Sequence, residues 1–419
     1  MEYTVIGKSY PRHDAILQVT GRSVYGDDIV RPGMLHAKIL RSAHAHARIK
    51  AIDFSLAATI PGVRAIVTAQ DVPHKRYGFT HQDQPVLADD KVRYLGDAVA
   101  AIAADSVQIA EDAVNKIRVE YEPLPGVFDP IAAMAPDAPL IHTGSNIVSH
   151  VKIRSGDIEQ GWRESDRIIE ETITTPMNEH AMIEPHAAVA EVNHQGAFVV
   201  WASLQRPFTI AADLAKILDK PLNQIRVITT AVGGAFGGKN EITFEPIICL
   251  LAMKSGRPVK LIYTREDEFQ ASTVRHPYIT KYKTGVMNDG TLVARQVEII
   301  SDCGAYVSWG ASTLTKAAVH AAGPYRIPHV ATDGYLVYTN KPVGGAMRGF
   351  GVTQLGFAYE VHMDTIAAEL DINPVELRLT NLFCDNCVLP TGQQIELVSL
   401  RETLAKALQL ADRGEEDKS

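Results

Sequence analysis

The sequence has little cysteine, no long apolar run and no excess of positive charge. Four cysteines in 419 residues are too few for a disulfide scaffold and favour a reducing compartment. A formal net charge of −8 without a basic block argues against a nucleic-acid surface. No apolar run approaches the roughly 18 residues of a membrane helix, and the N-terminus lacks the basic start and apolar segment of a secretory signal. We therefore expect a cytoplasmic protein that binds neither nucleic acid nor membrane.

The order of strand-like and helix-like segments predicts an α+β chain of two or three domains. Residues 18–127 have the pattern of a small α/β module. Five prolines lie between Glu122 and Asn146, so residues 128–146 are expected to form an extended linker. Residues 147–400 mix strands and helices again, with a hairpin turn at Asn288-Asp289-Gly290. Residues 401–419 form a charged tail.

A glycine-rich loop at residues 232–240 follows a strand-like run and precedes a helix-like one. Glycine permits close backbone approach to a ligand, and a strand, a glycine turn and a helix N-terminus together form an anion site. The spacing from Gly233 to Lys239 matches a phosphate-binding P-loop, but Asn240 stands where that motif needs Ser or Thr. A phosphorylated or oxyanionic ligand is therefore predicted, and a non-catalytic nucleotide-binding scaffold is the alternative.

A second glycine-rich loop, residues 344–351, also leads into a helix. We expect the two loops to form two walls of one cavity, in which Arg348 offers its guanidinium to an oxyanion. A surface loop with an exposed Phe350 is the alternative. Gln205 ends a strand just before a helix, where a side chain can project into a cleft, although a solvated turn residue has the same pattern.

The remaining candidate ligands lack the spacing of a metal site. Glu184-x-His186 and Glu179-His180 have no helical partner, which favours structural roles. Cys384-x-x-Cys387 is a single thiol pair without the second pair or the histidines that zinc needs. It also lacks a thioredoxin-like context, so two ordinary thiols are predicted.

Taken together, these segments resemble the molybdopterin-binding subunit of the xanthine dehydrogenase and aldehyde oxidase family of molybdenum hydroxylases. The matching pieces follow one another through nearly the whole chain: Gly7-Lys8-Ser9, Thr20-Gly21, Tyr25-x-Asp27-Asp28, Tyr94-Leu95-Gly96-Asp97, Glu184-Pro185-His186, Trp201-Ala202-Ser203-x-Gln205, Gly233 to Lys239 and Arg348-Gly349-Phe350-Gly351. The resemblance implies that residues 18–127 form the family's α/β hammerhead domain. Residues 147–400 then correspond to its first, mixed α/β, molybdopterin-binding domain.

The resemblance also implies roles for residues of both loops. It places Gln205, Phe236 and Arg348 around the molybdenum, and it adds Gly234 and Gly237 to the cofactor-binding residues.

Three further positions are implied to face the substrate. Phe350 would stack on its ring, while Asn240 and Lys316 stand where purine-oxidising members carry Glu and Arg. Gly349 replaces the Cys of carbon monoxide dehydrogenases. Purines and carbon monoxide therefore fit less well than other substrates.

The family's large subunit is about twice as long as this chain, and no carboxylate here matches the family's catalytic base. The resemblance therefore implies the larger half of a split enzyme without a catalytic residue of its own, the base glutamate lying on a second molybdopterin subunit. Nicotinate dehydrogenases divide their molybdenum subunit in this way. Hydroxylation of an electron-poor N-heteroaromatic carbon with water, nicotinate to 6-hydroxynicotinate, is thus expected, and a purine or an aldehyde is the alternative substrate.

The implied cofactor is molybdopterin, as the cytosine dinucleotide, with molybdenum and a terminal sulfido or selenido ligand. The chain has no cluster or flavin motif. We therefore expect 2Fe–2S clusters and FAD on separate iron–sulfur and FAD subunits.

Overall fold

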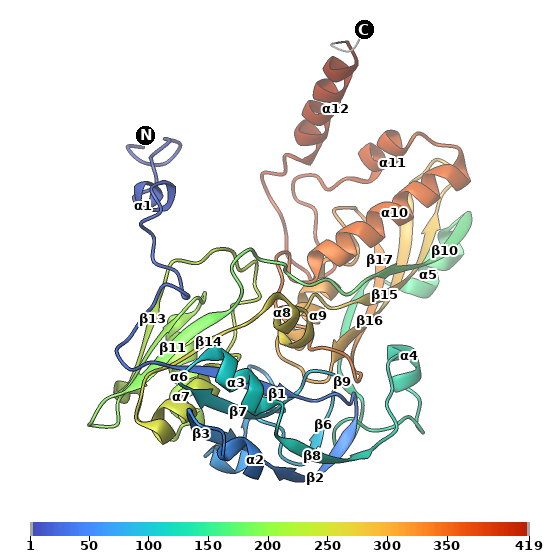
Figure 1. Ribbon diagram of the computed structural model, residues 1–419. Coiled ribbons are helices and arrows are strands. Elements are labelled where there is room, and N and C mark those ends of the chain that lie inside the picture. Colours follow the sequence, from blue (N-terminus) through green and yellow to red (C-terminus); the bar gives the residue numbers. More distant parts are fainter. Residues whose placement is uncertain (1–2, 417–419) are drawn as a thin grey trace.

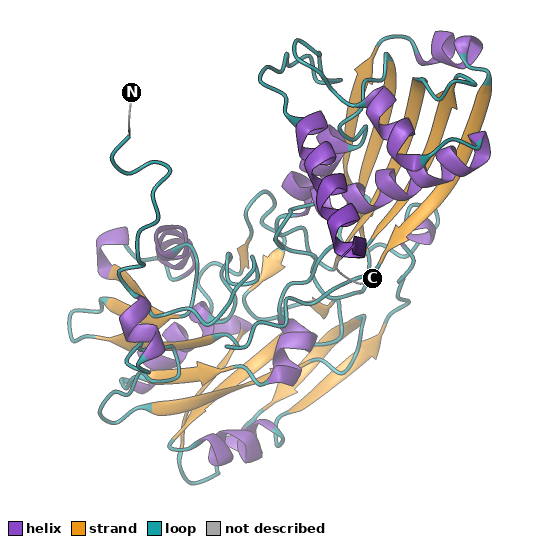
Figure 2. Cartoon of the chain, turned by 90° about the horizontal axis from the view of Figure 1, so that it is seen from above, coloured by secondary structure: helices purple, strands orange, loops and turns teal. Residues whose placement is uncertain are grey.

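Two large sheets form the framework of the chain, and Figure 2 shows them at opposite ends of the molecule with loops between them. The computed structural model describes residues 3–416. One sheet has seven strands in the order β13-β12-β11-β14-β1-β7-β3, and the other has five in the order β10-β15-β16-β17-β9. Among the described residues, no helix is long and apolar enough to cross a membrane.

The seven-stranded sheet combines strands from both halves of the sequence (Figure 1). Its strands are β1 (Leu35–Arg41), β3 (Val63–Thr68), β7 (Ala98–Ala104), β11 (Ala187–Val192), β12 (Phe198–Ala202), β13 (Ile225–Thr229) and β14 (Val259–Ile262). β1 pairs in parallel with β14, with Leu35 opposite Val259, and antiparallel with β7. Backbone hydrogen bonds therefore join the region 18–127 to the region 147–400. The proline-rich segment expected to be a linker connects the same two regions in the sequence.

The apolar run of β7 is explained by helices on both faces of the sheet. Ala101 and Ala103 belong to the core cluster that contains α7 (Glu245–Ser255), whereas Ala100 and Ile102 belong to the cluster that contains α3 (Val107–Val114). Successive side chains of a strand point to opposite faces, so a strand covered on both sides has no polar position.

Smaller elements complete this end of the molecule. They are the strands β2 (Ala47–Asp53), β6 (Lys91–Val92) and β8 (Arg118–Pro123) of a three-stranded sheet, β4 (Arg76–Tyr77) and β5 (Gln84–Pro85) of a two-stranded one, the helices α1 (Ala15–Val19), α2 (Ser55–Ala58), α6 (Pro207–Ile217) and α8 (Arg265–Ala271), and the 3₁₀ turns η1 (Ala69–Asp71) and η2 (Leu222–Gln224).

The five-stranded sheet carries helices that pack into two further core clusters. Its strands are β9 (Ile147–Ser155), β10 (Arg167–Thr175), β15 (Tyr278–Val286), β16 (Leu292–Gly304) and β17 (His329–Tyr338), and its helices are α5 (Ile158–Glu164), α9 (Gly310–His320), α10 (Val352–Leu370), α11 (Pro374–Asn381) and α12 (Leu400–Glu416). The hairpin predicted at Gly290 joins β15 to β16, and a φ of +87° at this position explains the glycine. The charged tail expected over residues 401–419 is helical through Glu416.

The proline-rich segment between the two regions contains one short helix, α4 (Pro130–Ala133). Asp129 caps it by accepting hydrogen bonds from the N–H groups of Ile131 and Ala132 at 2.8 and 2.9 Å. Asn146 then donates to the carbonyls of Ala133 and Pro139. These hydrogen bonds of Asp129 and Asn146 hold the segment in a defined conformation.

Candidate active site

The first glycine-rich loop lies between β13 and α7. It is held by a buried ion pair between Lys239 and Glu184. Lys239 Nζ lies 2.9 Å from a carboxylate oxygen of Glu184 and also donates to Ser203 Oγ at 2.8 Å. The same Glu184 carboxylate accepts from the backbone N–H of Gly233 at 2.6 Å. Burial opposes ionisation of Glu184, but hydrogen bonds from Ser203, Gly233 and Lys239 hold its pKa below the ordinary value.

This ion pair excludes the P-loop interpretation of the loop. The Lys239 side chain is 0% exposed and points back to Glu184, whereas a P-loop lysine must reach the phosphates of a nucleotide. Burial lowers the pKa of Lys239, and its hydrogen bonds to Glu184 counteract that effect. The motif Glu184-Pro185-His186 therefore has the structural role expected for it: His186 Nδ1 pairs with Glu268 at 2.9 Å, and its Nε2 lies 3.2 Å from the carbonyl oxygen of Gly238.

The second glycine-rich loop follows β17 and contacts the first one directly. The backbone N–H of Arg348 donates to the carbonyl of Phe236 at 2.7 Å. A Cβ on Gly237 would lie only 2.4 Å from the carbonyl oxygen of Ala346, so this contact requires glycine. Phe236 and Phe350 both have positive φ, +53° and +51°, a conformation that costs a non-glycine residue energy and is concentrated at ligand sites.

Gln205 connects the end of β12 to the first loop. Its side-chain Oε1 accepts from the N–H of Gly237 at 3.2 Å, and its backbone N–H donates to the carbonyl of Lys239 at 2.9 Å. The amide plane is thereby fixed, and the side chain remains exposed to the cavity beside it. Gln205 therefore lines a cavity, as expected, while its side chain stays exposed.

Arg275 and His276 hold the second loop in place from behind. The Arg275 guanidinium donates to the carbonyl of Arg348 at 2.9 Å and to Thr353 Oγ1 at 2.6 Å. His276 is buried against Gly344, where a Cβ would lie 2.5 Å from its ring. Burial, with a smaller effect of the Arg275 charge, lowers the pKa of His276 to about 3.

Between the loops lies a cavity of about 360 Å³. Its walls come from both loops and from the end of β12: Gln205, Phe236, Gly237, Asn240, Ala346, Met347, Arg348, Gly349 and Phe350. The backbone N–H groups of Phe236, Ala346, Met347 and Gly349 have no acceptor among residues 3–416. Unpartnered N–H groups, the NH₂ end of the Gln205 amide and glycines at the points of closest approach suit an anionic, oxygen-rich group.

Most of the residues implied by the resemblance lie in this cavity, but two do not line it. Gly234 has a φ of +105° and packs under Phe236 and Met182. Lys316 is exposed on α9.

Three residues around the site were not predicted from the sequence. Met347 lines the cavity between the loops, and Arg206 and Glu241, which directly follow Gln205 and Asn240, line a neighbouring cavity. The sequence could have indicated Arg206 and Glu241, because each directly follows a residue that the resemblance implied at the site.

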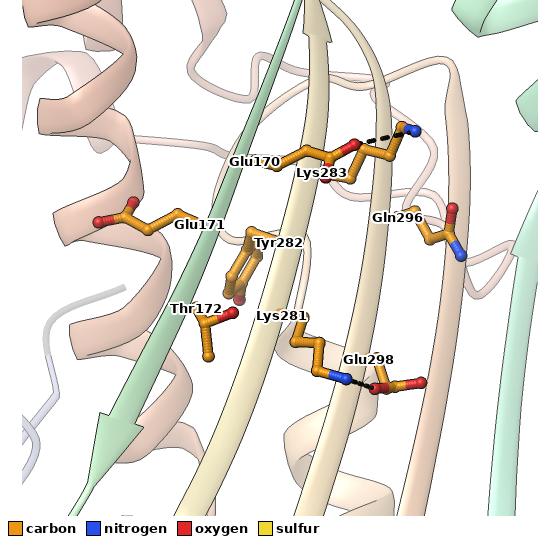
Figure 3. Close-up of a pocket in the computed structure, with 8 residues that line it drawn as sticks. All are labelled: Glu170, Glu171, Thr172, Lys281, Tyr282, Lys283, Gln296 and Glu298. Atoms are coloured by element: carbon orange, nitrogen blue, oxygen red, sulfur yellow. Dashed lines mark hydrogen bonds and ion pairs between the residues drawn. The ribbon is translucent and has the colours of Figure 1, made fainter.

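A larger hollow of about 500 Å³ on the five-stranded sheet has a different character (Figure 3). Its lysines are already paired across strands: Lys281 with Glu298 at 2.7 Å and Lys283 with Glu170 at 3.0 Å. No glycine-rich loop reaches it. Paired, solvated charges on a sheet face stabilise weakly, and both lysines of the hollow are already occupied. The cavity between the loops is therefore the candidate active site.

Comparison with known proteins agrees with this geometry. The model of the molybdopterin cofactor-binding domain matches residues 141–382, and that of the aldehyde oxidase and xanthine dehydrogenase a/b hammerhead domain matches residues 20–125. The nicotinate dehydrogenase large molybdopterin subunit of Eubacterium barkeri is 38% identical over 412 residues, which cover 98% of this chain and 97% of that one. The chain belongs to the xanthine dehydrogenase and aldehyde oxidase family.

Other members of this family are similar over a part of their length. The xanthine dehydrogenase molybdenum-binding subunit of Escherichia coli O157:H7 is 36% identical over 408 residues, 94% of this chain and 54% of its own length. The solved aldehyde oxidoreductase of Desulfovibrio gigas has a TM-score of 0.94 at 32% identity and covers 98% of this chain and 47% of its own. The chain thus spans about half the length of several relatives and nearly all of the nicotinate dehydrogenase polypeptide.

Membership in this family confirms the resemblance and the α+β fold class inferred from the sequence, and it makes the chain part of a molybdopterin-dependent oxidoreductase. The two glycine-rich loops both lie within the molybdopterin-binding match. Two of these relatives are subunits by name, a large molybdopterin subunit and a molybdenum-binding subunit.

Proposed function

We propose that this chain is the larger half of a split molybdenum hydroxylase that converts nicotinate to 6-hydroxynicotinate. The observation that carries the proposal is similarity along nearly the whole chain: the nicotinate dehydrogenase large molybdopterin subunit is 38% identical over 412 residues, which cover 98% of this chain.

The cavity fits the molybdenum end of a pterin cofactor. Gln205 presents its amide, the N–H groups of Phe236, Ala346 and Met347 are available to oxygen ligands, and Gly237 allows the two loops to close around the group. The cofactor, which we propose to be the cytosine dinucleotide form with a sulfido or selenido ligand, would supply the two-electron oxidation. This chain's own residues bind it, orient it and exclude water.

The cavity lacks a proton acceptor of its own. None of its described lining residues is Asp, Glu or His. A general base must lie within hydrogen-bond reach of the proton that it removes. We propose that a glutamate of a second molybdopterin subunit provides this group. Asn240 in place of a carboxylate also leaves a purine without a charged acceptor at this wall.

Exposed apolar side chains in the first part of the chain support the docking of such a subunit. Figure 1 shows the N-terminal segment with α1 extending away from the sheets. Its large apolar residues are mostly exposed: Tyr3, Val5, Ile6, Tyr10, Ile16, Leu17 and Val19. An unburied cluster of this kind is uncommon on a monomer and marks an interaction surface. Obligate interfaces usually bury more than about 2,000 Å². Iron–sulfur and FAD subunits complete the proposed assembly.

Co-purification from cells that express the chain with its natural partners tests the proposal. We expect a second molybdopterin-binding polypeptide, near one molybdenum per protomer and oxidation of nicotinate in preference to hypoxanthine or an aldehyde. The purified chain alone should be inactive with an artificial electron acceptor. Nicotinate oxidation by the isolated chain would contradict the split-enzyme proposal, and preference for an aldehyde would reassign the substrate.

A further inference from the structure

A second cavity of about 330 Å³ adjoins the candidate active site. Asn240 lines both cavities, so the two share a wall. The residues of the second cavity come from distant parts of the chain: Phe79 precedes β5, Arg206 stands before α6, and Trp309 precedes α9.

Aromatic rings connect the two cavities. Phe79 and Trp309 are stacked with their centroids 3.8 Å apart, and Trp309 meets Phe350 edge-on at 5.9 Å. Phe350 lines the first cavity and Trp309 the second. Phe350, Trp309 and Phe79 therefore form an aromatic surface, with a turn at the edge-on contact, that leads from the first cavity to Arg206.

Arg206 is the cationic group at the end of this surface. Its guanidinium lies over the Trp309 ring at 5.0 Å and near the Phe79 ring at 5.9 Å. Its side chain forms no salt bridge or hydrogen bond with another residue among residues 3–411, and the nearby Asp213 carboxyl interacts with its charge only at longer range. Stacking occupies the faces of a guanidinium and leaves its in-plane N–H donors available for a carboxylate.

We propose that Arg206 binds the carboxylate of an aromatic acid whose ring reaches the active site along Trp309 and Phe350. This inference rests on the proposed function and deepens it: the second cavity selects carboxylated N-heteroaromatic substrates over neutral ones. Lys316, which the resemblance implied to face the substrate, is exposed on α9 and lines neither cavity.

The other charged groups of the second cavity are compatible with an anion. Lys216 adds a second cation to the lining. The acidic members are Asp213 and Glu241, and burial raises the pKa of both, that of Glu241 to about 7. Ser308 Oγ lies 2.7 Å from both oxygens of the Glu241 carboxyl and restrains it. Burial thus disfavours the charged form of Glu241, which reduces the repulsion of a bound carboxylate.

Kinetics on the assembled enzyme test the substrate preference. Arg206→Gln should lower kcat/KM for nicotinate by about 10- to 100-fold, the usual value of a charge-assisted hydrogen bond, and that for nicotinamide by less than about threefold. Arg206→Lys should recover part of the loss. Arg226→Gln, on the exposed strand position of β13, is the control and should change neither. An equal loss with both substrates would overturn the proposal, because Arg206 would then only position Gln205.

Calorimetric titration with benzoate separates this inference from the proposed function, since benzoate needs no turnover. The assembled wild-type complex should bind benzoate at least tenfold more tightly than benzamide, and Arg206→Gln should remove the difference. If the complex oxidises no pyridine but binds benzoate through Arg206, the proposed reaction fails and the anion site stands. If benzoate binds no better than benzamide, the anion site fails.

Discussion

The backbone N–H of Arg348 donates to the backbone carbonyl of Phe236 over 2.7 Å, and this bond joins two loops that are far apart in the sequence. Each loop has one phenylalanine with positive φ, Phe236 and Phe350. Strained backbone persists only where its surroundings hold it. The buried Glu184–Lys239 pair supports the first loop and Arg275 supports the second. The two loops are thus held together by contacts within this chain.

Replacing Gln205 tests the amide at the proposed metal site. Gln205→Ala should leave folding and molybdenum content unchanged and slow turnover by about a hundredfold, the usual loss for one preorganised contact at a reacting centre. Gln195→Ala, in the exposed turn before β12, is the control. If Gln205→Ala kept wild-type turnover and full molybdenum content, Gln205 would have no role at the site.

Replacing Gly237 tests the close approach of the loops. Gly237→Ala would place a Cβ 2.4 Å from a backbone oxygen at a φ of +109°, so the loops should separate and metal analysis should show lost molybdenum. Gly256→Ala has the same kind of φ, +66°, but no heavy atom within 4 Å of the new Cβ. It should cost about 1 kcal/mol of stability and retain the metal. Equal retention by both variants would show that the contact is dispensable.

Removing the buried lysine tests its structural role. Lys239→Met leaves Glu184 buried and unpaired, which should lower the free energy of unfolding by about 3 kcal/mol. The double variant Lys239→Met, Glu184→Gln should recover part of this in urea titrations. Mg-ATP should stabilise neither the wild type nor the variants. Stabilisation of the wild type by ATP, lost in Lys239→Met, would support the nucleotide-binding alternative.

Replacing Phe350 tests its contact with the substrate ring. Phe350→Ala should raise KM for an aromatic substrate by up to about tenfold, because stacking contributes roughly 0.5–1.5 kcal/mol beyond area burial. Molybdenum content should not change. Phe357→Ala, half exposed on α10, should alter neither quantity. Loss of the cofactor in the Phe350 variant would mean that this ring packs the loop and does not contact substrate.

Acidification should destabilise the chain through His276. Its folded-state pKa of about 3 lies below the value of about 6.5 in the unfolded chain. The unfolded state therefore takes up a proton first as the pH falls, and stability is lost from pH 6.5 downward. Between pH 6.5 and 5 this single group costs about 2 kcal/mol. Unfolding of His276→Gln should show a flatter pH dependence, whereas His194→Gln, at an exposed turn, should keep the wild-type slope. Equal slopes would contradict the assignment.

Local patterns in the sequence determined the elements around the site. The glycines of residues 232–240 and 344–351 indicated two ligand-binding turns, and the strand end at Gln205 indicated a side chain in a cleft. The hairpin at Gly290 followed from its turn residues. The glycine-rich turns, the strand end and the hairpin depend on φ preferences and on hydrophobic periodicity. Both act over a few residues and can therefore be read from one sequence.

Only the tertiary structure decided which of these features meet. The parallel pairing of β1 with β14, the bond between Phe236 and Arg348, and the stacking of Arg206 on Trp309 all join residues remote in sequence. The direction of the Lys239 side chain is another such case, since a P-loop lysine and a buried ion-pair lysine have the same local sequence. Pairing of this kind depends on the burial and packing of whole elements, a collective property that no short stretch of sequence carries.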